Sequence, residues 1–371
     1  MSWIVLLKFS NVEYKKSTFC KVFVFLIFAL GVLRDTTVGT DIQMSMNSHY
    51  YGLWRDPLSG NSHAGYGFLI LTVILKVIDS YYFYYGAIFA MTMGMYFFSA
   101  KKMGINAAVF FAVFFASSTI TTSYNIIRQI LALSAAIMAY SYLIYDLDFC
   151  QWRKPQSSTL KKIAIYEAII LLLTYGFHIS IFILTIVPLF HLKIIQKYLS
   201  KDTVLWILLI LVVVVCTRYG STVQSILLVI ESHIDLGERA DFWVEMIELY
   251  GDSISSSHGM GSTFIAGSIA ILASRGRRNV LFYIGFVGFL LNQIGASGLG
   301  TVGRIFSNVS VFLIFYYAQI FGQLLKNYKL LFKENIGWII ILLFLISWTN
   351  KFYHTTILNG SISPYATYLF Q

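Results

Sequence analysis

The sequence predicts an all-α protein, a polytopic bundle of about 11–12 transmembrane helices. Of its 371 residues, 57% are hydrophobic and only 12% are charged. A soluble domain carries about twice that share of charge, so most of these side chains must face lipid or other helices. Val204–Val215 and Ile336–Ser347 are almost continuously apolar, as expected of membrane helices. We therefore expect residues 1–371 to form a single integral membrane domain.

The orientation of the helices follows from the uneven spread of the net charge of +10. Lysine and arginine cluster in alternate loops, and the positive-inside rule places such loops in the cytoplasm. These clusters lie at 8–21, 101–102, 153–162, 193–201, 275–278 and 326–333. The spans compatible with them are 19–33, 81–100, 105–121, 126–145, 163–177, 179–192, 204–219, 260–274, 279–296, 305–323 and 336–350.

Two segments between these spans are expected to lie in or on the membrane without crossing it. Residues 65–78 are apolar, but a further span there would move every later basic cluster outside, so we expect a re-entrant or interfacial segment after the first external loop, 34–64. The long external loop 220–259 holds seven acids and one basic residue, Arg239. Within it, 240–250 alternates apolar and acidic residues at helical spacing, which predicts an amphipathic helix on the membrane surface.

Arginine is concentrated on the outer side of this topology. The cytoplasmic clusters hold fifteen lysines and four arginines, whereas the external set holds six arginines and two lysines. Guanidinium binds phosphate through a bidentate fork, so this bias favours a phosphate ligand at the outer face. The alternative is that each arginine pairs with external acids or extends from a helix end to the water. The external arginines are Arg34, Arg55, Arg128, Arg218, Arg239 and Arg304.

Arg128 stands out from this set because it lies next to an apolar run, in or just under the membrane surface. An ionisable residue at that depth is costly and usually functional. Its neighbours Asn125 and Gln129 have amide groups that can orient the guanidinium. Arg304 follows the glycine-rich stretch 295–303, which is either a turn before a span or a loop that lets backbone approach phosphate.

Four short motifs, in this order, resemble the EpsG-type branch of the Wzy polysaccharide polymerases. They are Arg34-x3-Val38-Gly39-Thr40-Asp41 followed by Tyr50–Tyr51, Asn125-x2-Arg128-Gln129-x-Leu131-Ala132, Phe177-His178-x-Ser180, and Pro364-Tyr365. The chain departs from the family pattern at His63-Ala64-Gly65-Tyr66, where the family often has Glu-Pro-Gly-Tyr, and in lacking an additional span before Lys15.

The resemblance implies a glycosyltransferase C-type polymerase of the bacterial inner membrane. Its donor and acceptor would be undecaprenyl-pyrophosphate-linked oligosaccharides at the periplasmic face, joined into O-antigen or a related surface polysaccharide. A chain-length regulator is a possible partner, besides membrane lipid. No nucleic-acid partner, metal or other cofactor is expected, and the sequence has no phosphate-binding Gly-x4-Gly-Lys loop.

The expected chemistry assigns roles to a few residues. Fixed cations stabilise the leaving pyrophosphate, with Arg34, Arg128 and Arg304 as candidates and Gln129 and Arg239 as further substrate-binding residues. His178 is a candidate base for the acceptor hydroxyl because of its ordinary pKa, and Asp41 is the second candidate. Alternatively, His178 closes a helical hairpin and Asp41 caps a turn.

Two other functions fit the same composition. A flippase for lipid-linked units would have a cationic cavity inside the bundle and internal repeats, whereas here the ionisable residues gather toward one face. An O-antigen ligase, which transfers the finished chain to another acceptor, uses similar chemistry and remains an alternative.

Overall fold

The computed structural model describes residues 18–32, 52–56, 65–117, 127–147, 157–219, 260–298 and 300–326. In these ranges every regular element is a helix, which confirms the all-α fold for the described part of the chain. Packing divides the chain into two compact units, Met1–Pro188 with Ile314–Gln371, and Leu189–Leu313.

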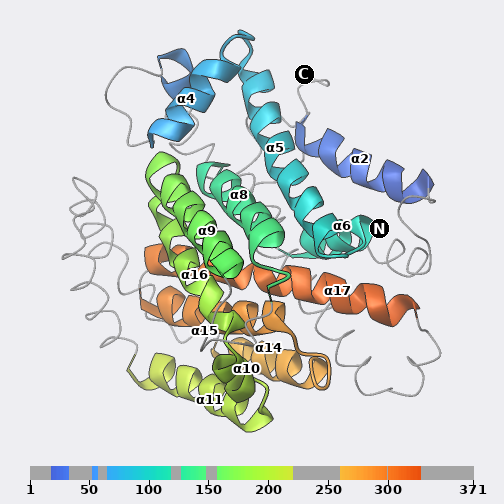
Figure 1. Cartoon of the computed structure of the whole chain (residues 1–371), viewed down its shortest axis with the longest axis vertical. Helices are drawn as coiled ribbons and strands as arrows, with labels where there is room; N and C mark the ends of the chain where they lie inside the picture. The colour runs from blue at the N-terminus through green and yellow to red at the C-terminus, as the bar shows by residue number, and fades with distance from the viewer. Residues whose placement is uncertain are drawn as a thin grey trace. The chain divides into compact units, whose positions relative to one another are not determined.

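The first unit is built around the long helix α5 (Tyr81–Lys102), which lies between α2 (Thr18–Val32) and α8 (Ile127–Leu143) (Figure 1). It also contains α4 (Tyr66–Leu75), α6 (Ala107–Ala116), α9 (Ser157–Gly176) and most of the 3-10 helix η2 (Ile179–His191) and of α17 (Phe312–Lys326).

Local signals explain where α5 and α6 begin and end. Ser80 caps α5 by accepting a hydrogen bond from the backbone N–H of Phe83, at 3.3 Å. Gly104, with φ of 71°, makes the turn that follows α5. Asn106 then caps α6 by accepting from Ala108 and Val109, at 2.9 and 3.3 Å. Each helix therefore starts at a residue whose side chain satisfies backbone donors.

Aromatic residues form the centre of this unit. The rings of Phe110 and Phe315 lie 4.6 Å apart between centroids, and the ring of Tyr96 lies 5.2 Å from that of Phe114. Tyr96, Phe110 and Phe315 are each 0% exposed. Helix α17 is thus packed against α5 and α6 through Phe315.

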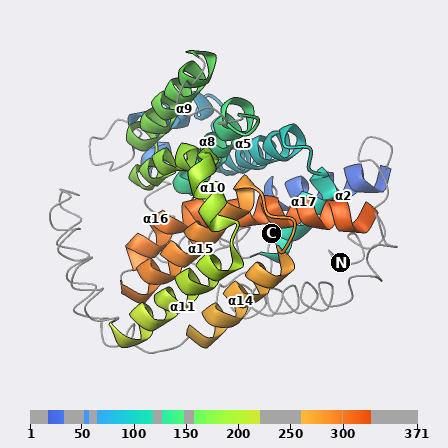
Figure 2. The ribbon, with the colours of Figure 1, turned by 60° about the horizontal axis from the view of Figure 1, so that its bottom comes forward.

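The second unit contains α10 (Lys193–Leu199), α11 (Asp202–Arg218), α14 (Met260–Ala273), α15 (Val280–Gly298) and α16 (Gly300–Ser310) (Figure 2). Helices α15 and α16 form a tight hairpin because two glycines of α15 lie against the returning chain. A Cβ on Gly288 would lie 2.5 Å from the backbone of Ser310, and one on Gly285 would overlap the backbone of Leu313. Only glycine permits this approach.

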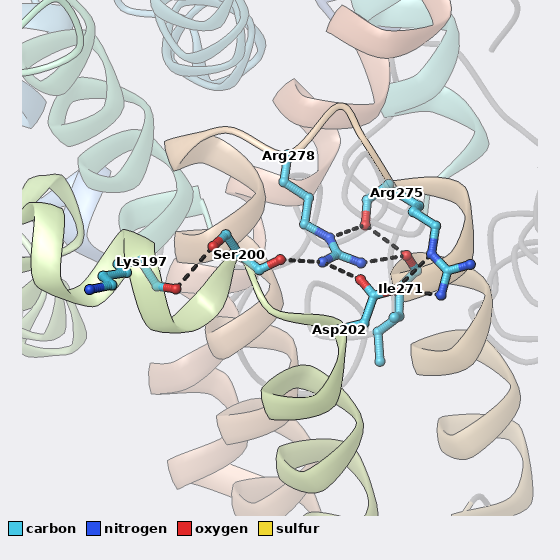
Figure 3. A network of polar contacts seen from close by, with 7 residues as sticks. Lys197, Ser200, Asp202, Ile271, Arg275 and Arg278 are labelled. Carbon is cyan, nitrogen blue, oxygen red and sulfur yellow. Dashed lines mark hydrogen bonds and ion pairs between the residues drawn. The ribbon is translucent and has the colours of Figure 1, made fainter.

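An ion cluster joins the turn before α11 to the turn after α14, as Figure 3 shows. Asp202 accepts from the Nη2 of Arg275 at 2.5 Å and from the Nη1 of Arg278 at 2.6 Å. The Arg278 side chain is only 5% exposed and also donates to the carbonyls of Ser200 and Ile271. Two of the basic residues predicted to mark a cytoplasmic loop therefore also hold two helix ends together.

The helices follow the predicted spans closely, but most are short. Among the described residues, only the stretch Ile305–Gln323 has the length and composition to cross a membrane. Ile179–His191 and Lys193–Leu199, bent by 89°, would form a second if counted as one broken span. The span expected at 336–350 lies outside the described residues. The number of spans thus stays a prediction.

Candidate functional site

A cluster of buried apolar and aromatic residues brings together four segments that the topology places toward the outer face. We call it the Tyr84 cluster. Its members come from 52–55 and the starts of α4, α5 and α8, with Phe177 from the end of α9 packed against them. The buried members are Leu53, Phe68, Tyr84, Tyr85, Ile88, Ile127 and Leu131.

Hydrogen bonds and ring contacts fix these segments to one another. The hydroxyl groups of Thr72 and Tyr84 lie 3.2 Å apart in a buried contact between α4 and α5. The ring of Trp54, from the segment 52–56, lies 5.7 Å from that of Tyr81. The Nζ of Lys76 donates to the backbone carbonyl of Arg55. The segment 52–56 is therefore anchored beside α4 and α5.

Helix α4 meets the end of α9 through a backbone contact. A Cβ on Gly65 would lie 2.5 Å from the carbonyl carbon and oxygen of Gly176 and 2.7 Å from the carbonyl oxygen of Tyr175. A Cβ on Gly67 would lie 2.7 Å from the ring of Phe177. The Gly-x-Gly spacing at 65–67 thus lets α4 lie directly on the segment that leads to His178.

Arg128 is the second residue of α8, and its side chain is only 6% exposed. The adjacent Gln129 is 2% exposed. Two buried members of the Tyr84 cluster, Ile127 and Leu131, lie on either side of this pair in the sequence. The structure therefore places the predicted arginine in a buried position at a helix start. Burial strengthens the attraction of its charge for an anion, because little water remains to screen it.

His178 follows α9 and is partly buried. Its Nδ1 lies 2.7 Å from the Oγ of Ser180 and accepts a hydrogen bond from the backbone N–H of Ser180 at 3.3 Å. When Nδ1 accepts the bond from this N–H, the neutral ring carries its proton on Nε2. In this geometry His178 presents a donor at Nε2, and protonating Nδ1 would cost the Ser180 contact.

The remaining predicted site residues lie outside the described residues or in the second unit. Arg34, Asp41 and Arg239 lie outside the described residues. Arg304 belongs to α16 in the second unit. Of the predicted set, the structure places Arg128, Gln129 and His178 on elements that contribute to one cluster.

Sequence reasoning missed several contacts of this region. It did not identify Thr72 with Tyr84, nor the glycines at 65, 67 and 176 as contact residues. The two glycines at 65 and 67 were the available signal, since small residues allow helix backbones to approach closely in membranes. It also did not single out Gln293 in the apolar helix α15, whose amide lies 2.6 Å from the Thr263 hydroxyl.

The helical architecture, the apolar helices and the buried arginine are those of a membrane-associated helical protein. The EpsG family matches residues 18–367, and the chain belongs to this family. The family is one of polysaccharide polymerase-type membrane proteins with glycosyltransferase-like activity. Comparison with curated proteins and with solved structures gave no match.

Proposed function

We propose that this protein polymerises undecaprenyl-pyrophosphate-linked oligosaccharide repeat units into O-antigen or a related surface polysaccharide. Membership of the EpsG family supports the reaction class. The observation that carries the proposal is the burial of Arg128 at the start of α8, beside the Tyr84 cluster. A buried guanidinium near the outer membrane surface suits a pyrophosphate that approaches from the lipid.

In the proposed reaction the acceptor hydroxyl attacks the anomeric carbon of the donor. The new glycosidic C–O bond forms, the bond between that carbon and the pyrophosphate oxygen breaks, and lipid pyrophosphate leaves. Charge grows on the leaving group, so fixed cations stabilise the transition state. Arg34, Arg128 and Arg304 supply this charge, and Gln129 and Arg239 contribute to substrate binding.

The proton of the acceptor hydroxyl goes to a base, for which His178 and Asp41 are the two candidates. The contact between His178 and Ser180 bears on this choice. With Nδ1 occupied by the Ser180 N–H, the ring donates through Nε2. This geometry favours His178 as a hydrogen-bond donor to substrate and Asp41 as the base.

We also propose that the protein crosses the inner membrane about 11–12 times with its active site facing the periplasm. Exposed apolar stripes support contact with lipid. Along α4 and the turn after it the stripe is Ile70, Val73, Ile74 and Val77, and on α11 it is Ile207, Ile210, Leu211 and Val214, each between 44% and 85% exposed. At ten residues, α4 is about 15 Å long, half of a bilayer core, which suits a re-entrant segment.

Cysteine labelling from the outside tests this orientation. A cysteine replacing Ser255, in the loop 220–259, should react with a membrane-impermeant maleimide in intact cells whose outer membrane is permeabilised. A cysteine replacing Ser157, at the start of α9 within the basic cluster 153–162, should react only after lysis. The reverse pattern would refute the topology and, with it, the periplasmic placement of the site.

Deletion of the gene tests the reaction. A strain lacking a polymerase should display single repeat units on its surface lipid and lose the polymer ladder. A ligase or flippase deletion would instead remove all units from the surface. Retention of a normal ladder would refute a polymerase role.

A further inference from the structure

Three helices of the second unit place polar groups at the ends that the topology assigns to the outer face. These are the end of α11, the start of α14 and the end of α15. The buried hydroxyl of Thr263 on α14 donates to the Oε1 of Gln293 on α15, at 2.6 Å. The Sγ of Cys216 on α11 lies 3.9 Å from the backbone carbonyl of Gln293. Gln293 thus lies where all three helices meet.

The amide of Gln293 is held by one end only. Its oxygen accepts from Thr263, and among the described residues none accepts from its Nε2. The side chain is half-buried, and its Nε2 is not among the enclosed polar atoms of the described residues, so a ligand can reach it. An amide N–H pair fixed in an otherwise apolar helix is costly unless a partner binds it.

The hairpin of α15 and α16 places this amide at the level of a predicted cation. Gly285 lies against Leu313 and Gly288 against Val309 and Ser310, so the two helices run antiparallel side by side (Figures 1 and 2). Both rise equally per residue, so positions at equal distance from the turn face each other. By this register, position 293 lies at the level of position 304.

We infer that Gln293, oriented by Thr263, is a saccharide-binding residue whose Nε2 donates to a sugar hydroxyl next to the pyrophosphate. The inference rests on the proposed function and adds a sugar subsite in the second unit. Amide side chains suit polyhydroxylated ligands because the Nε2 donor and Oε1 acceptor match hydroxyl groups. Arg304, a proposed pyrophosphate-binding residue, has its helix position at the same level, which is why we place the sugar next to the pyrophosphate.

The alternative is that Thr263 and Gln293 only join two helices, as polar pairs often do in membranes.

Two lipid probes distinguish these two roles of Gln293 with purified full-length protein. The first is undecaprenyl pyrophosphate, which carries no sugar. The second is the lipid-linked oligosaccharide pool extracted from the strain that lacks this gene. Apparent affinities come from the ligand-induced rise in Tm.

We expect Gln293→Met to weaken binding of the oligosaccharide lipid about three- to tenfold, the effect of one hydrogen bond, with undecaprenyl pyrophosphate binding unchanged. Thr263→Val should also weaken binding of the oligosaccharide lipid, whereas Thr263→Ser keeps the hydroxyl and should bind it as the wild type does. The matched control is Thr217→Val, which removes a hydroxyl near the same end of α11 that bonds only to its own helix, at 2.8 and 3.1 Å.

Wild-type affinity of Gln293→Met for the oligosaccharide lipid would overturn the assignment of Gln293. Equal loss for both probes would also overturn it, because it would show general damage to the helix junction. If the wild-type protein itself bound both probes equally, saccharide recognition would fail altogether, and the proposed function with it.

Discussion

Replacing Gly65 with alanine should disrupt the contact between the start of α4 and the end of α9, just before His178. The new Cβ would lie 2.5 Å from two backbone atoms of Gly176 and 2.7 Å from the carbonyl oxygen of Tyr175. Backbone cannot move aside by changing a rotamer, so α4 must shift as a whole. Overpacking of this kind costs about 1–3 kcal/mol. The φ of −58° at Gly65 suits alanine, which offsets about 0.4–1 kcal/mol of that cost through the unfolded state.

Gly94 and Gly176 supply matched controls for the same substitution. A Cβ on Gly94, inside α5, would meet nothing within 4 Å, so Gly94→Ala should stabilise the protein by about 1 kcal/mol through helix propensity. A Cβ on Gly176 would lie 3.6 Å from Gly67, an ordinary contact, so Gly176→Ala should be nearly neutral.

The assay is the midpoint of thermal unfolding of a fluorescent fusion, followed by size-exclusion chromatography, alongside the surface polymer ladder. At about 2–4 °C per kcal/mol, Gly65→Ala should lower Tm by several degrees and Gly94→Ala should raise it slightly. The ladder should shorten with Gly65→Ala alone. A Gly65→Ala protein with wild-type Tm and a full ladder would refute the close approach of α4 and α9.

Arg128→Lys should abolish most polymer while the protein still accumulates, because an ammonium does not reproduce the guanidinium fork. Polymer ladders and immunoblots of the protein measure this, and a full ladder would contradict it. His178→Asn should keep protein abundance, because its side-chain oxygen can accept from the Ser180 N–H where Nδ1 does. It should lower the polymerisation rate by about 10- to 100-fold through loss of the Nε2 donor, and normal polymer would remove His178 from the chemistry. Although partial burial raises the pKa of Asp202, hydrogen bonds from two arginines outweigh it and lower that pKa overall. The stabilisation is therefore complete above the unfolded pKa of about 3.9 and is lost as pH falls through the folded pKa, so wild-type Tm should drop on acidification more steeply than that of Asp202→Asn.

Helix positions were predictable because apolar runs end at polar loops. The expected span 126–145 corresponds to α8 at Ile127–Leu143, and 204–219 corresponds to α11 at Asp202–Arg218. α9 begins at Ser157, six residues before the expected span at 163, because lysines at 161 and 162 do not interrupt a helix. Hydropathy locates the apolar segment, whereas the backbone hydrogen bonds extend beyond it.

Contacts between distant segments were not predictable in this way. The burial of Arg128 followed from its apolar neighbours in sequence. The contact of Gly65 with Gly176, by contrast, joins residues far apart along the chain and leaves no periodic signal. The same holds for Thr263 with Gln293. The sequence indicates that a polar side chain in an apolar helix needs a hydrogen-bond partner, but only the fold shows which residue that partner is.

The cluster in Figure 3 shows what arginine does in this chain that lysine does not. On the side predicted to be cytoplasmic, lysines dominate, and arginine appears where several acceptors must be met at fixed angles. Arg278 donates to Asp202, Ser200, Ile271 and Ser274 at once, which an ammonium on a flexible stem does not reproduce. At this junction the chain therefore uses arginine for a geometry that lysine does not provide. The same rule applied to the external arginines indicates partners with several acceptor oxygens in a fixed arrangement, which is the chemistry of a pyrophosphate.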